Sequence, residues 1–63
     1  MTRFKIRVFK ENGSWFFRWD NVAVPTACGV TGPLSSKNEA EFEQQRFVED
    51  ETKKRPLVTF ESA

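Results

Sequence analysis

The sequence predicts an α+β fold: a three-stranded antiparallel meander, one helix packed on it, and a short C-terminal strand, in the order βββαβ. Three observations predict this fold. Apolar and charged residues alternate over positions 2–9, an Asn-Gly pair stands at positions 12–13, and a helix-capping sequence begins at residue 36. The 63 residues allow a single small domain, 1–63. Since so short a chain buries only about 60% of its unfolded surface, we expect its seven Phe and two Trp residues to supply most of the core.

The first strand is predicted over residues 2–9. Phe4, Ile6 and Val8 alternate there with charged residues, which is typical of a half-buried strand. A second strand, over residues 14–21, places its own aromatic side chains on alternate positions. The two segments therefore each have one apolar face that points to a common core.

The turn between these strands fixes how they pair. Asn12-Gly13 favours a type I′ turn, because that turn needs positive φ at both central residues. Cross-strand partners then have numbers that sum to 25, which places Val8 opposite Phe17 on the core side. The other side of the hairpin carries four cations around an aromatic pair, namely Arg3, Lys5, Arg7 and Arg18 around Phe9 and Phe16.

The third strand is expected over residues 22–30. Pro25 removes one backbone donor, so this strand is predicted at a sheet edge or broken at that point. Residues 31–33, Thr-Gly-Pro, are expected to form a loop. Cys28, within the strand, is expected to be a small apolar filler.

The helix is predicted from its cap. Ser36 and Glu39 form a capping box, and the helix is expected to run to about residue 52 or 53, before Pro56. Its inner stripe is short, consisting of Ala40, Gln44, Phe47 and Val48, and Phe42 falls on the opposite side. Residues 57–60 are expected to form a short strand or an extended tail.

Composition gives further expectations. The formal net charge is +1, but residues 1–20 hold five cations against two carboxylates, and residues 36–63 hold five against seven. No apolar run approaches the roughly 20 residues of a membrane span. With one cysteine and no N-terminal signal pattern, we expect a cytoplasmic protein that does not contact membranes.

Enzymatic chemistry is not expected. The chain has no histidine and no phosphate-binding glycine motif, and Cys28 has no histidine to activate it. The helix acids are typical of a solvated face. We therefore expect no catalytic residue, no metal site and no cofactor.

The basic hairpin face is the most informative feature. Arg and Lys neutralise phosphates, and guanidinium groups bind guanine edges through two hydrogen bonds. A two-stranded ribbon fits the major groove, where the Phe9–Phe16 pair can stack on bases or contact a thymine methyl group. Outward cations on strands are also a common means of solubility, so this pattern alone leaves both interpretations open.

The hairpin and the helix start resemble a known family. Residues 12–18, Asn-Gly-Ser-Trp-Phe-Phe-Arg, and residues 35–41, Ser-Ser-Lys-Asn-Glu-Ala-Glu, resemble the AP2-like N-terminal, arm-type DNA-binding domain of phage tyrosine recombinases over roughly residues 4–50. The resemblance implies a three-stranded sheet that enters the major groove. It also implies that Arg3, Lys5, Arg7, Arg18 and Phe16 face DNA.

The sequence departs from that family in two places. The basic Gly-Lys-Arg turn that usually precedes the third strand is absent, and residues 20–25 contain no cation. No linker to a catalytic domain follows the helix. A member with these features is expected to be a stand-alone protein of a phage or mobile element without recombinase activity.

Two other functions remain open. The chain can be a small phage-type inhibitor or adaptor of a larger protein, with Phe42 as an anchor between Glu39 and Glu43 on the helix. It can also form a homodimer through Phe9, Phe16 and the edge at residues 22–30. The expected partner is therefore DNA, a larger protein or a second copy.

Overall fold

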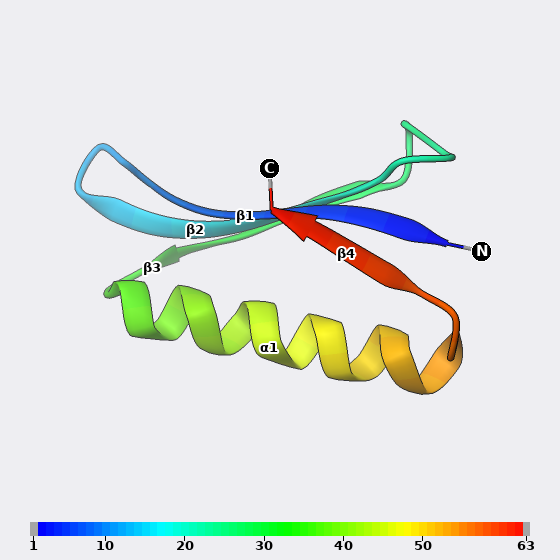
Figure 1. Cartoon of the computed structure of the whole chain (residues 1–63). Helices are drawn as coiled ribbons and strands as arrows, with labels where there is room; N and C mark the ends of the chain where they lie inside the picture. Colours follow the sequence, from blue (N-terminus) through cyan, green and yellow to red (C-terminus); the bar gives the residue numbers. More distant parts are fainter. Residues whose placement is uncertain (1, 63) are drawn as a thin grey trace.

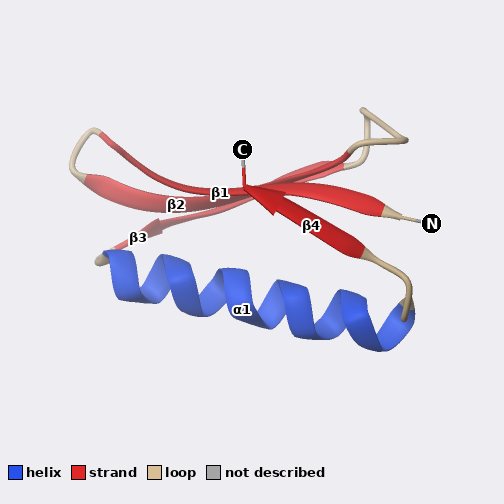
Figure 2. Ribbon diagram, viewed as in Figure 1, coloured by secondary structure: helices blue, strands red, loops and turns tan. Residues whose placement is uncertain are grey.

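One helix lies across one face of a four-stranded sheet, in a computed structural model that describes residues 2–62 (Figures 1 and 2). The strand order is β3-β2-β1-β4. This confirms the predicted α+β class and the βββαβ element order. The elements are β1 (Arg3–Glu11), β2 (Ser14–Asn21), β3 (Cys28–Leu34), α1 (Lys37–Lys54) and β4 (Thr59–Ser62).

The hairpin has the predicted turn and register. Asn12 and Gly13 have φ values of 51° and 80°, as a type I′ turn requires. Val8 pairs with Phe17, and Phe9 pairs with Phe16. The register confirms which side chains share each face of the β1–β2 ribbon.

Phe47 of α1 is the centre of the core. Its ring lies 5.1 Å from Phe4, 5.6 Å from Phe17, 5.2 Å from Trp19 and 6.0 Å from Phe60, between ring centroids. Phe4 and Phe17 are only 2% and 1% exposed. One helix residue thus joins aromatic side chains from three strands.

The third strand lies further along the chain than predicted. Residues 22–27 form a loop, because the Asn21 side chain accepts hydrogen bonds from the backbone N–H groups of Ala23 and Val24, at 3.0 and 3.2 Å. The predicted bounds 22–30 were therefore wrong, because β3 begins at Cys28, but the predicted position at a sheet edge is confirmed. Cys28 is exposed, so its expected role as a buried filler was also wrong.

The predicted loop over residues 31–33 lies inside β3. Its register with β2 shifts opposite Phe16, where Gly32 has a φ of 146°. A Cβ atom on Gly32 would lie 2.5 Å from Cδ1 of Phe16. The residues that normally interrupt a strand form a bulge here, and glycine makes room for the neighbouring ring.

Gly29 of β3 gives the first test of this packing. A Cβ atom there would lie 2.6 Å from Nε1 of Trp19, on the paired strand. We expect Gly29→Ala to destabilise the fold by about 1–3 kcal/mol, because the indole must move out of the core. Urea denaturation would measure the loss, and an unchanged midpoint would contradict this packing.

Helix α1 begins and ends close to the predicted positions. Ser36 Oγ accepts a hydrogen bond from the Glu39 backbone N–H at 3.2 Å, which confirms the predicted N-cap. The Glu39 carboxylate accepts in turn from the Ser35 N–H, one residue before the N-cap. Phe42 lies on the outer side of α1 and is 58% exposed.

Strand β4 extends the sheet beside β1. It pairs in parallel with residues 3–6, so that Phe60 lies beside Phe4 in the core. Leu57, which was expected in this strand, is 75% exposed and precedes it. β4 adds a fourth strand at the edge of the sheet, and it leaves the face opposite α1 uncovered (Figure 2).

Candidate nucleic-acid interface

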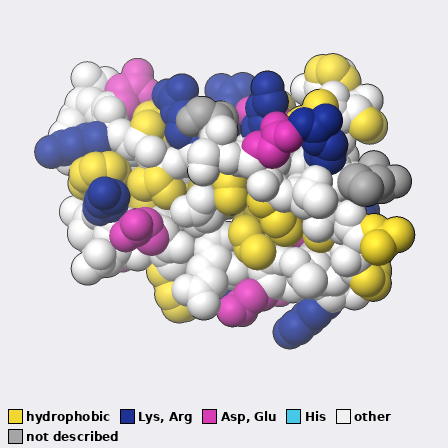
Figure 3. Space-filling view, in the orientation of Figure 1, with side chains coloured by type: hydrophobic (Ala, Val, Ile, Leu, Met, Phe, Trp, Pro, Cys, Tyr) yellow, Lys and Arg dark blue, Asp and Glu magenta, His cyan; other side chains and the backbone are white. Residues whose placement is uncertain are grey.

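The face of the sheet opposite α1 is called the open face. Paired residues in neighbouring strands share a face, so the register places all six predicted DNA-contacting residues on this one surface. Figure 3 shows Lys and Arg side chains gathered above the sheet with carboxylates among them. The open face holds Arg3, Lys5, Arg7, Phe9, Glu11, Ser14, Phe16, Arg18, Asp20, Cys28, Val30, Thr59 and Glu61.

Two of the four cations on the open face have carboxylate partners. Arg18 donates from Nε and Nη2 to the two oxygens of Asp20, each at 3.2 Å. This hydrogen bonding, with the charge of Asp20, raises the pKa of the Arg18 guanidinium, which stays cationic at any working pH. Arg3 pairs with Glu61 of β4.

Arg7 and Arg18 lie directly opposite each other on β1 and β2. Like charges in such a cross-strand pair destabilise a sheet. The two guanidinium groups contact different partners. That of Arg18 lies against Asp20, and that of Arg7 lies 4.7 Å from the ring centroid of Phe9. Arg7 forms no ion pair with any other residue of the described range 2–62.

The aromatic pair forms a packed row across the sheet. The rings of Phe9 and Phe16 are 5.3 Å apart and inclined by only 17°. The Arg7 guanidinium lies over the ring of Phe9, and Gly32 lies close to the ring of Phe16. Because the ring faces already have partners within the protein, this pair is better placed to offer apolar edges than to stack on bases.

Lys5 lies between two acidic neighbours. It is opposite Asp20 on β2 and opposite Glu61 on β4. Both carboxylates already contact arginines, so the centre of the open face holds four cations against two anions. The predicted register already places Asp20 opposite Lys5 on this face, which the structure confirms, whereas Glu61 was not expected here. Alternation along β2 places Asp20 beside Arg18, whereas the position of Glu61 depends on a pairing that the sequence alone does not reveal.

The residues predicted to bind a protein partner are not free to act together. Glu39 caps α1. The carboxylate of Glu43 lies 3.6 Å from Nη1 of Arg46, whose guanidinium lies 5.9 Å from the Phe42 ring centroid. Phe42 is exposed, but its predicted acidic neighbours contact other groups.

Within residues 2–62, no three His, Cys, Asp or Glu side chains are placed to bind one metal ion. Over the same range, no helix combines the length and the apolar character needed to cross a membrane. Comparisons with models of protein families, with curated proteins and with solved structures found no match to this chain. The function must therefore be argued from the open face itself.

Proposed function

We propose that this protein is a non-catalytic module that binds DNA through its open face. The observation that carries the proposal is that Arg7 and Arg18, both exposed, occupy opposite positions on the two central strands of an uncovered sheet. Like charges at opposite positions destabilise a sheet, and an arrangement that costs stability is often retained for binding. A phosphate bound on this face would accept hydrogen bonds from both guanidinium groups once they turn toward it from Phe9 and Asp20.

The hairpin supplies a suitable shape. Among residues 2–62, β4 pairs only with residues 3–6, so no described strand pairs with the outer edge of β1 from Arg7 to the turn. A two-stranded ribbon of this kind fits the major groove of B-DNA. Arg7 would then contact phosphate or a guanine edge, and the edges of Phe9 and Phe16 would meet thymine methyl groups.

The carboxylates on the open face limit the number of strong phosphate contacts. Lys5 and Arg7 have no ion pair among the described residues, whereas Arg3 and Arg18 must share their charge with Glu61 and Asp20. We therefore expect between two and four phosphates to be neutralised. This is a small electrostatic contribution, in keeping with the net charge of +1.

Salt dependence tests the proposal directly. Binding to a random-sequence duplex should weaken from about 50 to about 200 mM salt, with a slope of log K against log salt between about −2 and −4. Fluorescence anisotropy with a labelled duplex would measure it. Absence of binding at the lower salt concentration would reject the DNA function.

A second candidate function is supported by Phe42. This ring is 58% exposed on the outer side of the N-terminal half of α1, where it is available to anchor a larger protein in an inhibitor or adaptor complex. Only this single residue favours that function, because Glu39 and Glu43 contact other groups. A negative result with DNA at low salt would make it the leading candidate.

A further inference from the structure

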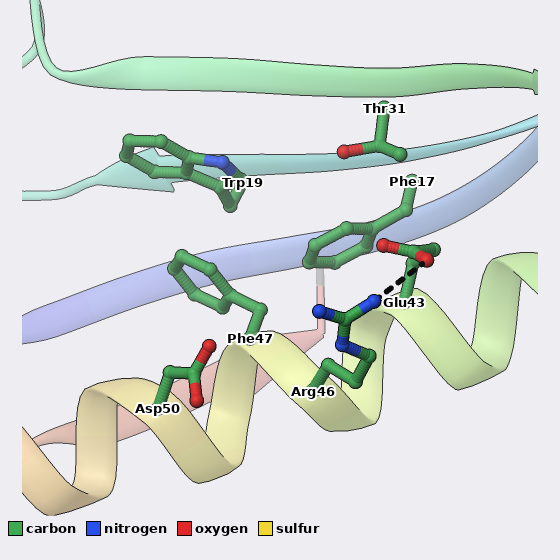
Figure 4. Close-up of a pocket in the computed structure, with 7 residues that line it drawn as sticks. All are labelled: Phe17, Trp19, Thr31, Glu43, Arg46, Phe47 and Asp50. Carbon is green, nitrogen blue, oxygen red and sulfur yellow. Dashed lines mark ion pairs between the residues drawn. The ribbon is translucent and has the colours of Figure 1, made fainter.

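A cavity of about 190 Å³ opens between α1 and the β2–β3 side of the sheet (Figure 4). It lies on the side of the sheet away from the open face, so the proposed DNA function does not use it. It is smaller than the roughly 300 Å³ of pockets that hold drug-sized molecules, and it suits a single side chain. Its lining residues are Phe17, Trp19, Thr31, Glu43, Arg46, Phe47 and Asp50.

The cavity exists because β3 presents small residues to the helix. Gly29 pairs with Trp19, and Thr31 pairs with Phe17. Gly29 must be small, because a Cβ atom would collide with the indole. No large side chain of β3 therefore fills the space beneath α1 at this edge.

The inner walls are aromatic and carry two polar groups. Trp19 and Phe47 are stacked with centroids 5.2 Å apart, and Phe17 closes the floor. Trp19 and Thr31 line the cavity from the sheet side, so that an indole and a hydroxyl face α1 across it (Figure 4). Aromatic walls of this kind suit an alkyl chain or a planar cation.

The rim is formed by one side of α1 and carries a net negative charge. Glu43, Arg46 and Asp50 recur at helical spacing along it. Arg46 is held loosely, since Nη1 lies 3.6 Å from the Glu43 carboxylate, beyond hydrogen-bond distance, and its side chain is 61% exposed. Asp50 forms no ion pair with another described residue.

We propose that this cavity binds an arginine side chain of a partner polypeptide. The guanidinium would lie over the aromatic walls within reach of the Asp50 and Glu43 carboxylates, and the alkyl stem would cross the rim to the partner. A guanidinium suits this position better than an ammonium group, because it is planar, weakly hydrated and able to pair with carboxylates while it contacts aromatic rings. Two carboxylates against one loosely held cation favour a positive ligand over a negative one.

The indole N–H resonance of Trp19 provides the readout, with Trp15 at the hairpin end of β2 as the internal reference. Titration of the 15N-labelled protein with N-acetyl-arginine amide should shift the Trp19 signal saturably, with a dissociation constant on the order of millimolar. The Trp15 signal should not move. N-acetyl-glutamate amide should not shift either signal, and a saturable shift with this anion would overturn the proposal.

Three variants test the sign of the recognised charge. Asp50→Asn should weaken arginine-amide binding about two- to fivefold, the range of an exposed ion pair. Arg46→Met removes the competing cation and should strengthen binding by a similar factor. Glu41→Gln, an exposed change on the same helix outside the cavity, is the matched control and should have no effect.

Two results would overturn this inference without touching the DNA proposal. One is the absence of a saturable Trp19 shift with arginine amide. The other is weaker binding in Arg46→Met, because that variant strengthens a site for cations and weakens a site for anions. Since the titration contains no DNA, failure here and failure of the proposed function are separate outcomes.

Discussion

Reversal of two charges, Arg7→Glu with Arg18→Glu, is expected to lower the affinity for duplex DNA at least about 100-fold at 50 mM salt. The two side chains face each other at the centre of the open face. Their replacement leaves two cations on the open face, Arg3 and Lys5, against five carboxylates, of which Glu11 lies at the hairpin end. The new carboxylates would repel the phosphates that the native guanidinium groups are proposed to attract. Fluorescence anisotropy would measure the loss.

A matched double variant distinguishes the effect of where the charges lie from the effect of the protein's net charge. Lys37→Glu with Lys53→Glu changes the total charge by the same amount, but both positions are exposed on α1. We expect this variant to retain most of the affinity. Far-UV circular dichroism would confirm that both proteins are folded. Undiminished DNA binding in a folded Arg7→Glu, Arg18→Glu variant would contradict the proposed interface.

Removal of the Phe47 ring is expected to have the largest effect on stability. Phe47→Ala should lower the free energy of unfolding by about 3–5 kcal/mol, because the ring contacts Phe4, Phe17, Trp19 and Phe60 at once. The total stability of a domain this small lies near the lower end of the usual range, about 5 kcal/mol. The variant should therefore be largely unfolded, as urea titrations followed by tryptophan fluorescence would show.

Phe42→Ala makes the same chemical change on the other side of α1. Since Phe42 is 58% exposed, we expect its loss to change stability by no more than about 0.5 kcal/mol. The comparison holds helix propensity constant and varies only the burial of the ring. Equal losses in the two variants would show that the packing of α1 on the sheet differs from that described.

The parts of the fold that depend on neighbours in sequence were predictable. The Asn12-Gly13 turn fixed the register of the hairpin, and Ser36 with Glu39 marked the helix start. Each of these signals acts through hydrogen bonds or φ values within a few residues. No distant part of the chain competes with them, so local chemistry was sufficient.

The third strand could not be placed in the same way. The sequence predicted a strand through Pro25 and a loop at Gly32-Pro33, whereas the structure has a loop at Pro25 and a strand through Gly32-Pro33. The difference comes from Asn21, whose side chain closes a loop, and from Phe16, whose ring occupies the space at Gly32. The second of these contacts joins two strands, and sequence pattern does not report it.

The sequence predicted which residues share the open face, but it did not predict how far carboxylates offset the positive charge there. Alternation placed the four cations and two Phe residues on one face, as the structure shows. The neutralising effect of Glu61 required the parallel pairing of β4 with β1, across more than 50 residues of chain. Predictions from local pattern therefore overstate how basic this surface is.

The short β4 strand also bears on the order in which the protein opens. Its pairing with β1 extends over only four residue pairs, and all four join residues at the greatest sequence separation in the sheet. Such a strand has a high closure entropy and few hydrogen bonds, so it should be the first to detach in native-state fluctuations. Detachment would release Arg3 from Glu61 while the hairpin stays folded. The net charge of the open face would therefore change whenever β4 detaches from the edge of the sheet.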